Sequence, residues 1–170
     1  MVERSGLTAR RPDRPLSFIG LSIIGLTIMA DQISKIIAER TLPFEEPIDL
    51  LPILSLYRVY NPGIAFSLLS SFGDIGLILL TLAITIVVLV FWQRAEEGGR
   101  LAAIGYALII GGALGNLIDR IAYGHVVDFL YLHLGERSLF VFNLADVALT
   151  IGPILLVAIY LLSSDRPAKP

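Results

Sequence analysis

Four aspartates stand inside or beside apolar segments, where a carboxylate needs either a partner or a function. They are Asp31, Asp119, Asp128 and Asp146. An ionisable group costs about 2.5–3.5 kcal/mol at the centre of a membrane helix, so each requires an explanation. Asp128 and Asp146 have no lysine or arginine within four positions. They are therefore the better candidates for chemistry.

Local ion pairs are the alternative explanation for the other two aspartates. Lys35 follows Asp31 by one helical turn, and Arg120 follows Asp119 directly. Either pair could be purely structural. Spacing alone does not decide whether Asp119 or Asp128 is the functional partner of Asp146.

Two carboxylates held close in a low-dielectric site share a proton and titrate as a pair. One can activate a water while its protonated partner polarises a carbonyl, the division of roles seen in aspartic proteases. Asn116 and Asn143 precede Asp119 and Asp146 by three residues, so each asparagine shares a helix face with its aspartate. These amides could orient the carboxyl groups.

Other catalytic chemistries have less support. His125 and His133 are the only histidines, and they cannot complete a three-ligand zinc site without carboxylate help. The absence of cysteine excludes a thiol nucleophile and a disulfide framework. Ser55, Ser67 and Ser138 have no neighbouring base in the sequence, although one could approach in space. We expect no metal and no cofactor.

The composition indicates that lipid surrounds most of the chain. Hydrophobic residues make up 55% of the 170 residues, charged residues 16%, and the mean hydropathy is +0.78. A helix needs about 20 apolar residues to cross a bilayer. The apolar runs predict one integral membrane domain over 1–170, with four spans at about 16–38, 76–92, 101–118 and 139–162.

The first apolar run could instead be a cleavable signal peptide, because arginines precede it and it passes through Met29-Ala30. Ile28 occupies a position where cleavage needs a small residue, and the run continues past Asp31. We therefore predict a retained span.

The long connection between the first two spans predicts a structured outer element. Residues 53–60 are rich in β-branched and aromatic types and end at Asn61-Pro62-Gly63, which is typical of a strand or hairpin followed by a turn. Several prolines prevent a long helix here. The predicted fold is an all-α membrane protein of four transmembrane helices with a small extracytoplasmic β-sheet lying on the membrane.

The distribution of basic residues predicts the orientation. Eight lysines and arginines lie in the two tails and the short second connection, and five lie in the two longer segments on the other side. By the positive-inside rule, both termini are expected in the cytoplasm and the aspartates toward the outer face. The net charge of −2 gives no basic surface for nucleic acid.

Five motifs, taken in order, resemble those of bacterial lipoprotein signal peptidases, the type II signal peptidases. They extend from residue 31 to residue 146 and read Asp31-Gln-x-x-Lys35, Asn61-Pro-Gly-Ile-Ala-Phe-Ser67, Gly115-Asn-Leu-Ile-Asp-Arg120, Gly124-His-Val-Val-Asp-Phe129 and Phe142-Asn-Leu-Ala-Asp146. A match of five ordered motifs is far more specific than a match of one.

The resemblance implies a metal-free aspartyl endopeptidase of the bacterial inner membrane, with four helices and a small outer β-cradle. Its substrates would be prolipoproteins that already carry diacylglyceryl on a cysteine, cut just before that cysteine. Membrane lipid would be its other partner, and we expect a monomer. The outer segment from Asn61 to Phe66 would cover the site.

The resemblance also assigns roles to residues. The catalytic pair falls on Asp128 and Asp146, and the choice of Asp128 over Asp119 rests mainly on it. Val147 stands where the family commonly has serine, so a hydrogen bond from that hydroxyl would be absent or replaced. The residues expected to support or line the site are Asp31, Lys35, Asn61, Gly63, Asn116, Asp119, Arg120, Asn143 and Ala145.

Two other classes of protein remain open on the residues alone. A small carrier could bind cations at intramembrane carboxylates, but its site should lie near the midplane between repeated halves. A purely structural membrane protein gives no reason for several unpaired polar groups at one depth.

Overall fold

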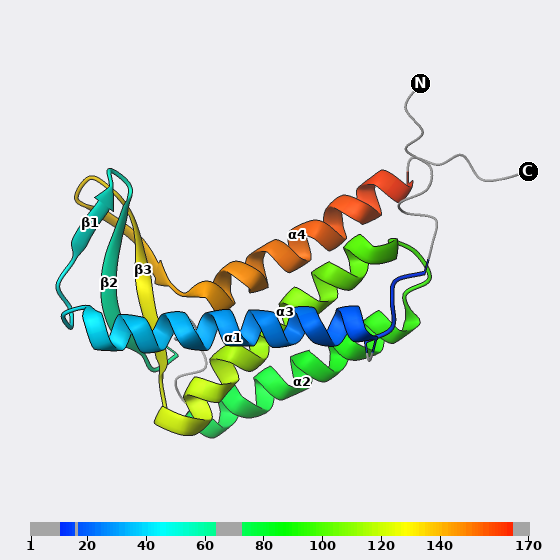
Figure 1. The fold of residues 1–170 in the computed structure, drawn as a ribbon, viewed down its shortest axis with the longest axis horizontal. Helices are drawn as coiled ribbons and strands as arrows, with labels where there is room; N and C mark the ends of the chain where they lie inside the picture. Colours follow the sequence, from blue (N-terminus) through cyan, green and yellow to red (C-terminus); the bar gives the residue numbers. More distant parts are fainter. Residues whose placement is uncertain (1–10, 16, 64–72, 165–170) are drawn as a thin grey trace, which may run out of the picture.

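Four helices extend from one side of a small sheet (Figure 1). The computed structural model describes residues 11–15, 17–63 and 73–164. In chain order the elements are α1 (Phe18–Thr41), β1 (Ile48–Leu51), β2 (Leu54–Asn61), α2 (Gly73–Arg94), α3 (Gly99–Tyr123), β3 (Val126–Leu134), β4 (Arg137–Phe142) and α4 (Leu144–Ser164). The segment predicted to cover the site, from Asn61 to Phe66, lies outside the described residues from position 64 onward.

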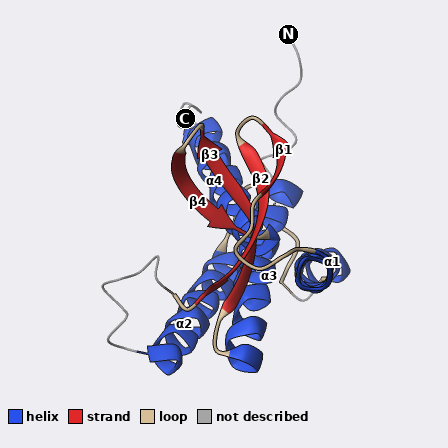
Figure 2. Ribbon diagram, turned by 90° about the vertical axis from the view of Figure 1, so that its left-hand side faces the viewer, coloured by secondary structure: helices blue, strands red, loops and turns tan. Residues whose placement is uncertain are grey.

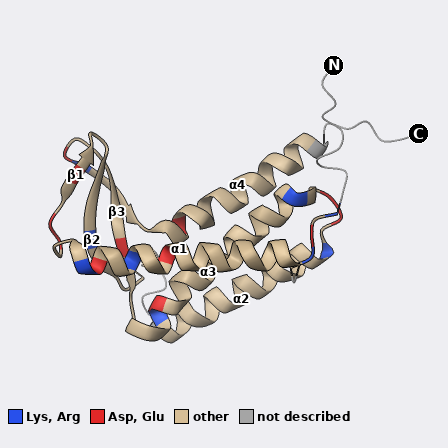
Figure 3. Cartoon of the chain, in the orientation of Figure 1, with Lys and Arg blue, Asp and Glu red and all other residues tan. Residues whose placement is uncertain are grey.

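All four helices are long and apolar enough to cross a membrane. The spans comprise Phe18–Thr41, Ile75–Arg94, Gly99–Tyr123 and Leu144–Leu162. At 1.5 Å per residue, the 20 residues of the second span reach about 30 Å, the thickness of a bilayer core. Figure 3 shows charged residues mainly toward the ends of the helices, with long uncharged stretches between them. The predicted fold class is confirmed.

The third helix lies at the centre of the bundle and packs against α1, α2 and α4. In an apolar 18-residue stretch of α3, 61% of the residues are buried, against 17–22% in the corresponding stretches of the other spans. Small residues allow close approach, as expected in membrane bundles. A Cβ on Gly112 would lie 2.5 Å from the carbonyl oxygen of Ala145 in α4, so only glycine fits at this crossing.

The boundaries of two predicted spans were wrong. The fourth was placed at 139–162, but residues 139–142 belong to β4 and the helix begins at Leu144. The third was placed at 101–118, but its helix continues to Tyr123 and ends at Gly124, which has the left-handed φ of 73° typical of a helix C-cap. The first error arose because hydropathy does not distinguish an apolar strand from an apolar helix. The second arose because the apolar run ends at the charged pair Asp119-Arg120, whereas the helix continues through it.

The sheet is antiparallel, with the strand order β1-β2-β3-β4. The strand or hairpin predicted over 53–60 is confirmed by β1 and β2. The pairing of β2 with β3 sets Val59 opposite Asp128 and Asn61 opposite Val126. Figure 2 shows the four strands together at one end of the helices. Because β3 follows α3 and β4 precedes α4, the sheet connects the ends of these two helices.

Candidate active site

The two predicted catalytic aspartates come from different kinds of element. Asp128 lies on β3 and is 2% exposed, whereas Asp146 is half-buried in the first turn of α4. They meet at the junction where β3, β4 and the start of α4 converge. Asn143, the residue between β4 and α4, hydrogen-bonds with both carboxylates.

Asn143 and Asp146 form a reciprocal cap at the start of α4. The backbone N–H of Asp146 donates to Asn143 Oδ1 at 3.0 Å, and the backbone N–H of Asn143 donates to Asp146 Oδ2 at 3.1 Å. This is the arrangement of a capping box, with asparagine at the N-cap and the acidic residue three positions later.

Amide side chains hold both carboxylates. Asn143 Nδ2 donates to Asp128 Oδ1 at 2.7 Å, and Asn61 Nδ2 donates to Asp128 Oδ2 at 2.9 Å. Asn116 Nδ2 donates to Asp146 Oδ1 at 2.8 Å. Each carboxyl oxygen of the pair therefore accepts from a neutral N–H group, which fixes its orientation.

The pKa of Asp128 is raised to about 6. Burial is the main cause, because water no longer solvates the charged form. The hydrogen bond from Asn61 opposes this shift, the charge of Asp146 adds to it, and Asn143 and Lys35 oppose it. A raised pKa beside a second carboxylate is the electrostatic condition for two groups that share one proton.

Lys35 stands behind the aspartate pair and is almost fully buried. Its ammonium nitrogen lies 2.8 Å from Asp31 Oδ2, 2.8 Å from Asp119 Oδ2 and 2.9 Å from Asn116 Oδ1. An ammonium has three donors, and all three are used. Of the two local ion pairs considered from the sequence, the pair of Asp31 with Lys35 is confirmed. Asp119 instead pairs with Lys35 across the α1–α3 interface.

Asn116 connects this ion cluster to the aspartate pair. Its Oδ1 accepts from Lys35 and from Asn143 Nδ2 at 3.1 Å, while its Nδ2 donates to Asp146. Asp31 extends the connection to α4, because its Oδ1 accepts from the backbone N–H of Ala145 at 3.0 Å. The network therefore ties α1, α3 and α4 together.

The remaining predicted residues lie at the edge of this network. Gly63 has a φ of 96°, and its N–H donates to Asn61 Oδ1 at 2.8 Å, which holds the Asn61 side chain in place. Arg120 Nη1 donates to the backbone oxygen of Asn116 at 3.4 Å. The structure thus brings the predicted site residues into one region.

Two residues of this region were missed by sequence reasoning. Gln32 Nε2 donates to Asp119 Oδ1 at 2.8 Å and also reaches Asp31 and the backbone oxygen of Gly115. A Cβ on Gly115 would lie 2.6 Å from Asp31 Oδ2, so the ion cluster requires glycine there. Both residues belong to the five motifs that carry the family resemblance, and this was the sequence signal that could have identified them as part of the site.

The histidines lie outside this network. The ring of His125 contacts that of Tyr60 in a tilted arrangement, with centroids 4.2 Å apart. His133 Nε2 lies 2.8 Å from Ser55 Oγ, which also contacts Asp49 Oδ1 at 2.7 Å. Because Asp49 contacts the serine rather than the imidazole, this group lacks the arrangement of a Ser-His-Asp triad.

The fold and the site define an integral membrane protein with a connected cluster of carboxylates at the sheet end of its spans. The chain belongs to the signal peptidase II family. The family model described as "Signal peptidase (SPase) II" matches residues 23–162, and the predicted resemblance is therefore confirmed. The family comprises membrane peptidases.

Similar proteins and solved structures agree with this assignment. A "Lipoprotein signal peptidase" of Mesorhizobium japonicum is 47% identical over 135 residues, covering 79% of this chain and 80% of the relative. One of Sinorhizobium fredii is 43% identical over 152 residues, covering 89% and 88%. A solved "Bacterial membrane enzyme structure by the in meso method at 1.9 A resolution" has a TM-score of 0.77 and 28% identity, covering 90% and 97%.

Proposed function

We propose that this chain is an aspartic endopeptidase that removes signal peptides from prolipoproteins in the bacterial inner membrane. Family membership supports the substrate class. The observation that carries the catalytic type is the pair of carboxyl groups of Asp128 and Asp146, held by donors at the end of the spans. The substrates would carry diacylglyceryl on a cysteine and be cut just before it.

The different surroundings of the two aspartates support different roles. Asp146 is only half-buried and accepts from Asn116 and from a backbone N–H at the start of a helix, a position that suits a general base. Burial raises the pKa of Asp128 to about 6, which favours a general acid. We assign the shared proton to Asp128.

The reaction then follows from this assignment. A water between the two groups loses a proton to Asp146 and attacks the carbonyl carbon of the scissile peptide bond. Asp128 donates its proton to the carbonyl oxygen and forms a tetrahedral intermediate with two hydroxyl groups. As the C–N bond breaks, Asp146 protonates the leaving amine and Asp128 recovers a proton from one hydroxyl. No covalent enzyme intermediate forms.

The membrane position of the site suits a lipid-modified substrate. The signal helix would lie beside the spans, and the acyl chains would remain in lipid and fix the depth of the bond to be cut. Arg11, Arg14, Arg94 and Arg100 lie at the helix ends opposite the sheet. By the positive-inside rule, that end is cytoplasmic and the site lies toward the outer face.

The first test is cleavage of a purified diacylglyceryl-modified prolipoprotein, followed by gel shift with a chelator present throughout. Wild type should cleave, and Asp128→Asn and Asp146→Asn should not. Asp49→Asn is the matched control, since Asp49 is a carboxylate of β1 that bonds Ser55 outside the network. Cleavage by either site variant would contradict the assignment and move attention to Asp119.

Folding of the Asp128→Asn variant must be measured alongside. Both oxygens of Asp128 accept from asparagine Nδ2 groups. An asparagine at position 128 would place its own NH₂ group opposite one of these donors, and two donors cannot form a hydrogen bond with each other. A thermal unfolding curve separates loss of chemistry from this local conflict. A variant that melts like wild type and does not cleave supports the proposed role.

A further inference from the structure

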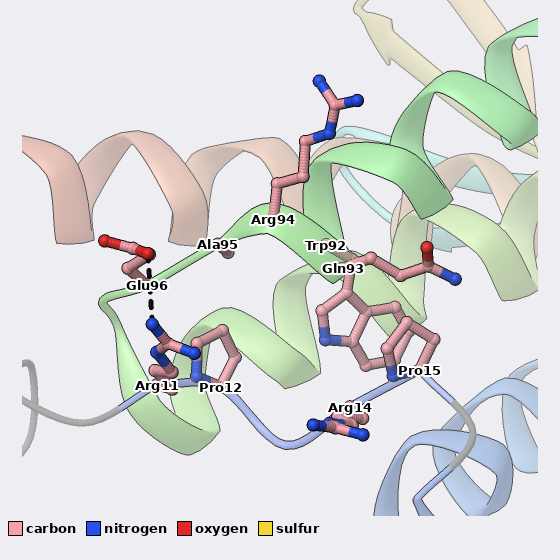
Figure 4. A pocket seen from close by; sticks show the side chains of 9 residues that line it. All are labelled: Arg11, Pro12, Arg14, Pro15, Trp92, Gln93, Arg94, Ala95 and Glu96. Atoms are coloured by element: carbon pink, nitrogen blue, oxygen red, sulfur yellow. Dashed lines mark hydrogen bonds and ion pairs between the residues drawn. The ribbon is translucent and has the colours of Figure 1, made fainter.

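A pocket of about 770 Å³ lies at the end of the helices opposite the aspartates. Residues 11, 12, 14 and 15 line it, together with residues 92–96 at and just after the end of α2 (Figure 4). Its volume falls in the range of about 300–1,000 Å³ that is typical of ligand sites. Nothing in the proposed peptidase mechanism uses this pocket.

The charged residues of the pocket leave a positive excess. They are Arg11, Arg14, Arg94 and Glu96, which gives three positive charges, one negative charge and a net charge of +2. Arg11 Nη2 pairs with Glu96 Oε1 at 3.1 Å on the surface. Within residues 11–15, 17–63 and 73–164, the side chains of Arg14 and Arg94 form no ion pair or hydrogen bond. Two unpaired guanidinium groups therefore border the same pocket.

The backbone that carries Arg14 is held in place independently of any ligand. Trp92 is 2% exposed, and its Nε1–H donates to the backbone oxygen of Asp13 at 2.7 Å. Pro12 and Pro15 flank this bond and are buried, and each restricts its own φ. The cationic segment is thus fixed against the end of α2 before a ligand binds, which lowers the entropic cost of binding.

The surroundings of the pocket are suited to a lipid rather than to a soluble anion. Phe18 at the start of α1 is 87% exposed, and Phe91 in the last turn of α2 is 62% exposed. These apolar side chains lie at the same end of the spans as the arginines. A ligand with a negative headgroup and acyl chains would contact both kinds of surface.

We propose that this pocket binds the headgroup of an anionic phospholipid. In Figure 4 the guanidinium groups of Arg14 and Arg94 lie on different sides of the Trp92 ring and do not converge on one point. This separation favours a headgroup with two phosphates, such as that of cardiolipin. Basic pockets at the ends of membrane helices bind such headgroups, and each arginine near the surface contributes about a fivefold gain in affinity.

The test is native mass spectrometry of the full chain released from nanodiscs that contain cardiolipin and phosphatidylcholine in equal amounts. Wild type should retain cardiolipin preferentially. The double variant Arg14→Gln, Arg94→Gln should lose about 25-fold in this preference, the product of two fivefold effects. Arg137→Gln, at the start of β4 beyond the other end of the spans, is the matched control and should retain the wild-type preference.

Three results would overturn the proposal. The first is equal retention of the two lipids by wild type. The second is an unchanged preference in the double variant with wild-type melting behaviour. The third is displacement of the lipid by inorganic phosphate. Excess inorganic phosphate should not displace the lipid, because phosphate lacks the acyl chains; displacement by phosphate would instead indicate a site for a free anion.

Discussion

Replacement of Asn143 tests whether one residue both starts α4 and holds the aspartate pair. Its side chain is fully buried, its Oδ1 caps the helix, and its Nδ2 donates to Asp128 at 2.7 Å. Loss of an N-cap costs about 1 kcal/mol. Leaving the buried Oδ1 of Asp128 without its donor costs about 1–3 kcal/mol. We therefore expect Asn143→Ala to destabilise the protein by about 2–4 kcal/mol.

Asn143→Ser separates the two roles. Serine caps a helix about as well as asparagine, but it cannot also replace the amide donor to Asp128. The serine variant should recover about 1 kcal/mol, which corresponds to about 2–4 °C in Tm relative to the alanine variant. Its cleavage rate should remain about 5- to 150-fold below wild type, the rate equivalent of the missing hydrogen bond.

The measurements are thermal unfolding and initial rates of cleavage of a diacylglyceryl-modified prolipoprotein, both in the same nanodiscs. A serine variant that cleaves at the wild-type rate would refute the reasoning, since Asn143 would then act only as a helix cap. An alanine variant as stable as wild type would show that the capping box does not contribute measurably to stability.

Three further predictions follow from the same network. Asn61→Ala removes a donor that lowers the pKa of Asp128, so that pKa should rise further above about 6. Because the proposed general acid acts in its protonated form, the alkaline limb of the pH profile of kcat/KM should move to higher pH, and a shift to lower pH would contradict the proposed role. Gly115→Ala places a Cβ 2.6 Å from Asp31 Oδ2 and should lower both Tm and the rate of cleavage. Unchanged values would mean that the Asp31–Lys35–Asp119 ion cluster rearranges at little energetic cost. Lys35→Met leaves two buried carboxylates without their cation and should cost about 3–5 kcal/mol, measured as loss of folded protein; a normal melting curve would argue against a charged cluster.

The fold could be predicted where hydropathy alone decides it. The four apolar runs identified the spans because a bilayer demands long apolar helices. The start of the fourth span was misplaced because Leu139–Phe142 is apolar in either conformation. Asn143 followed three positions later by Asp146 is a helix-start signal, and Gly124 is a helix-stop signal. Both signals were available in the sequence and would have corrected the boundaries.

The candidate site could be predicted as a set of residues but not as a network. Spacing along one helix gave the pair of Asp31 with Lys35, because both residues lie on the same face. It could not give the contact of Lys35 with Asp119, since that contact depends on how α1 packs against α3. The donors to Asp128 come from β2 and from the start of α4, and only the three-dimensional fold brings them together.

The pairing of Asp31 with Lys35 has a consequence for how the chain enters the membrane during synthesis. Since the two charges lie one turn apart on α1, the first helix can neutralise itself and insert before any later helix exists. The acidic group that α3 adds at Asp119 meets a lysine already in place. Asp146 arrives last with α4, so the proposed pair of aspartates is complete only when the final helix is integrated.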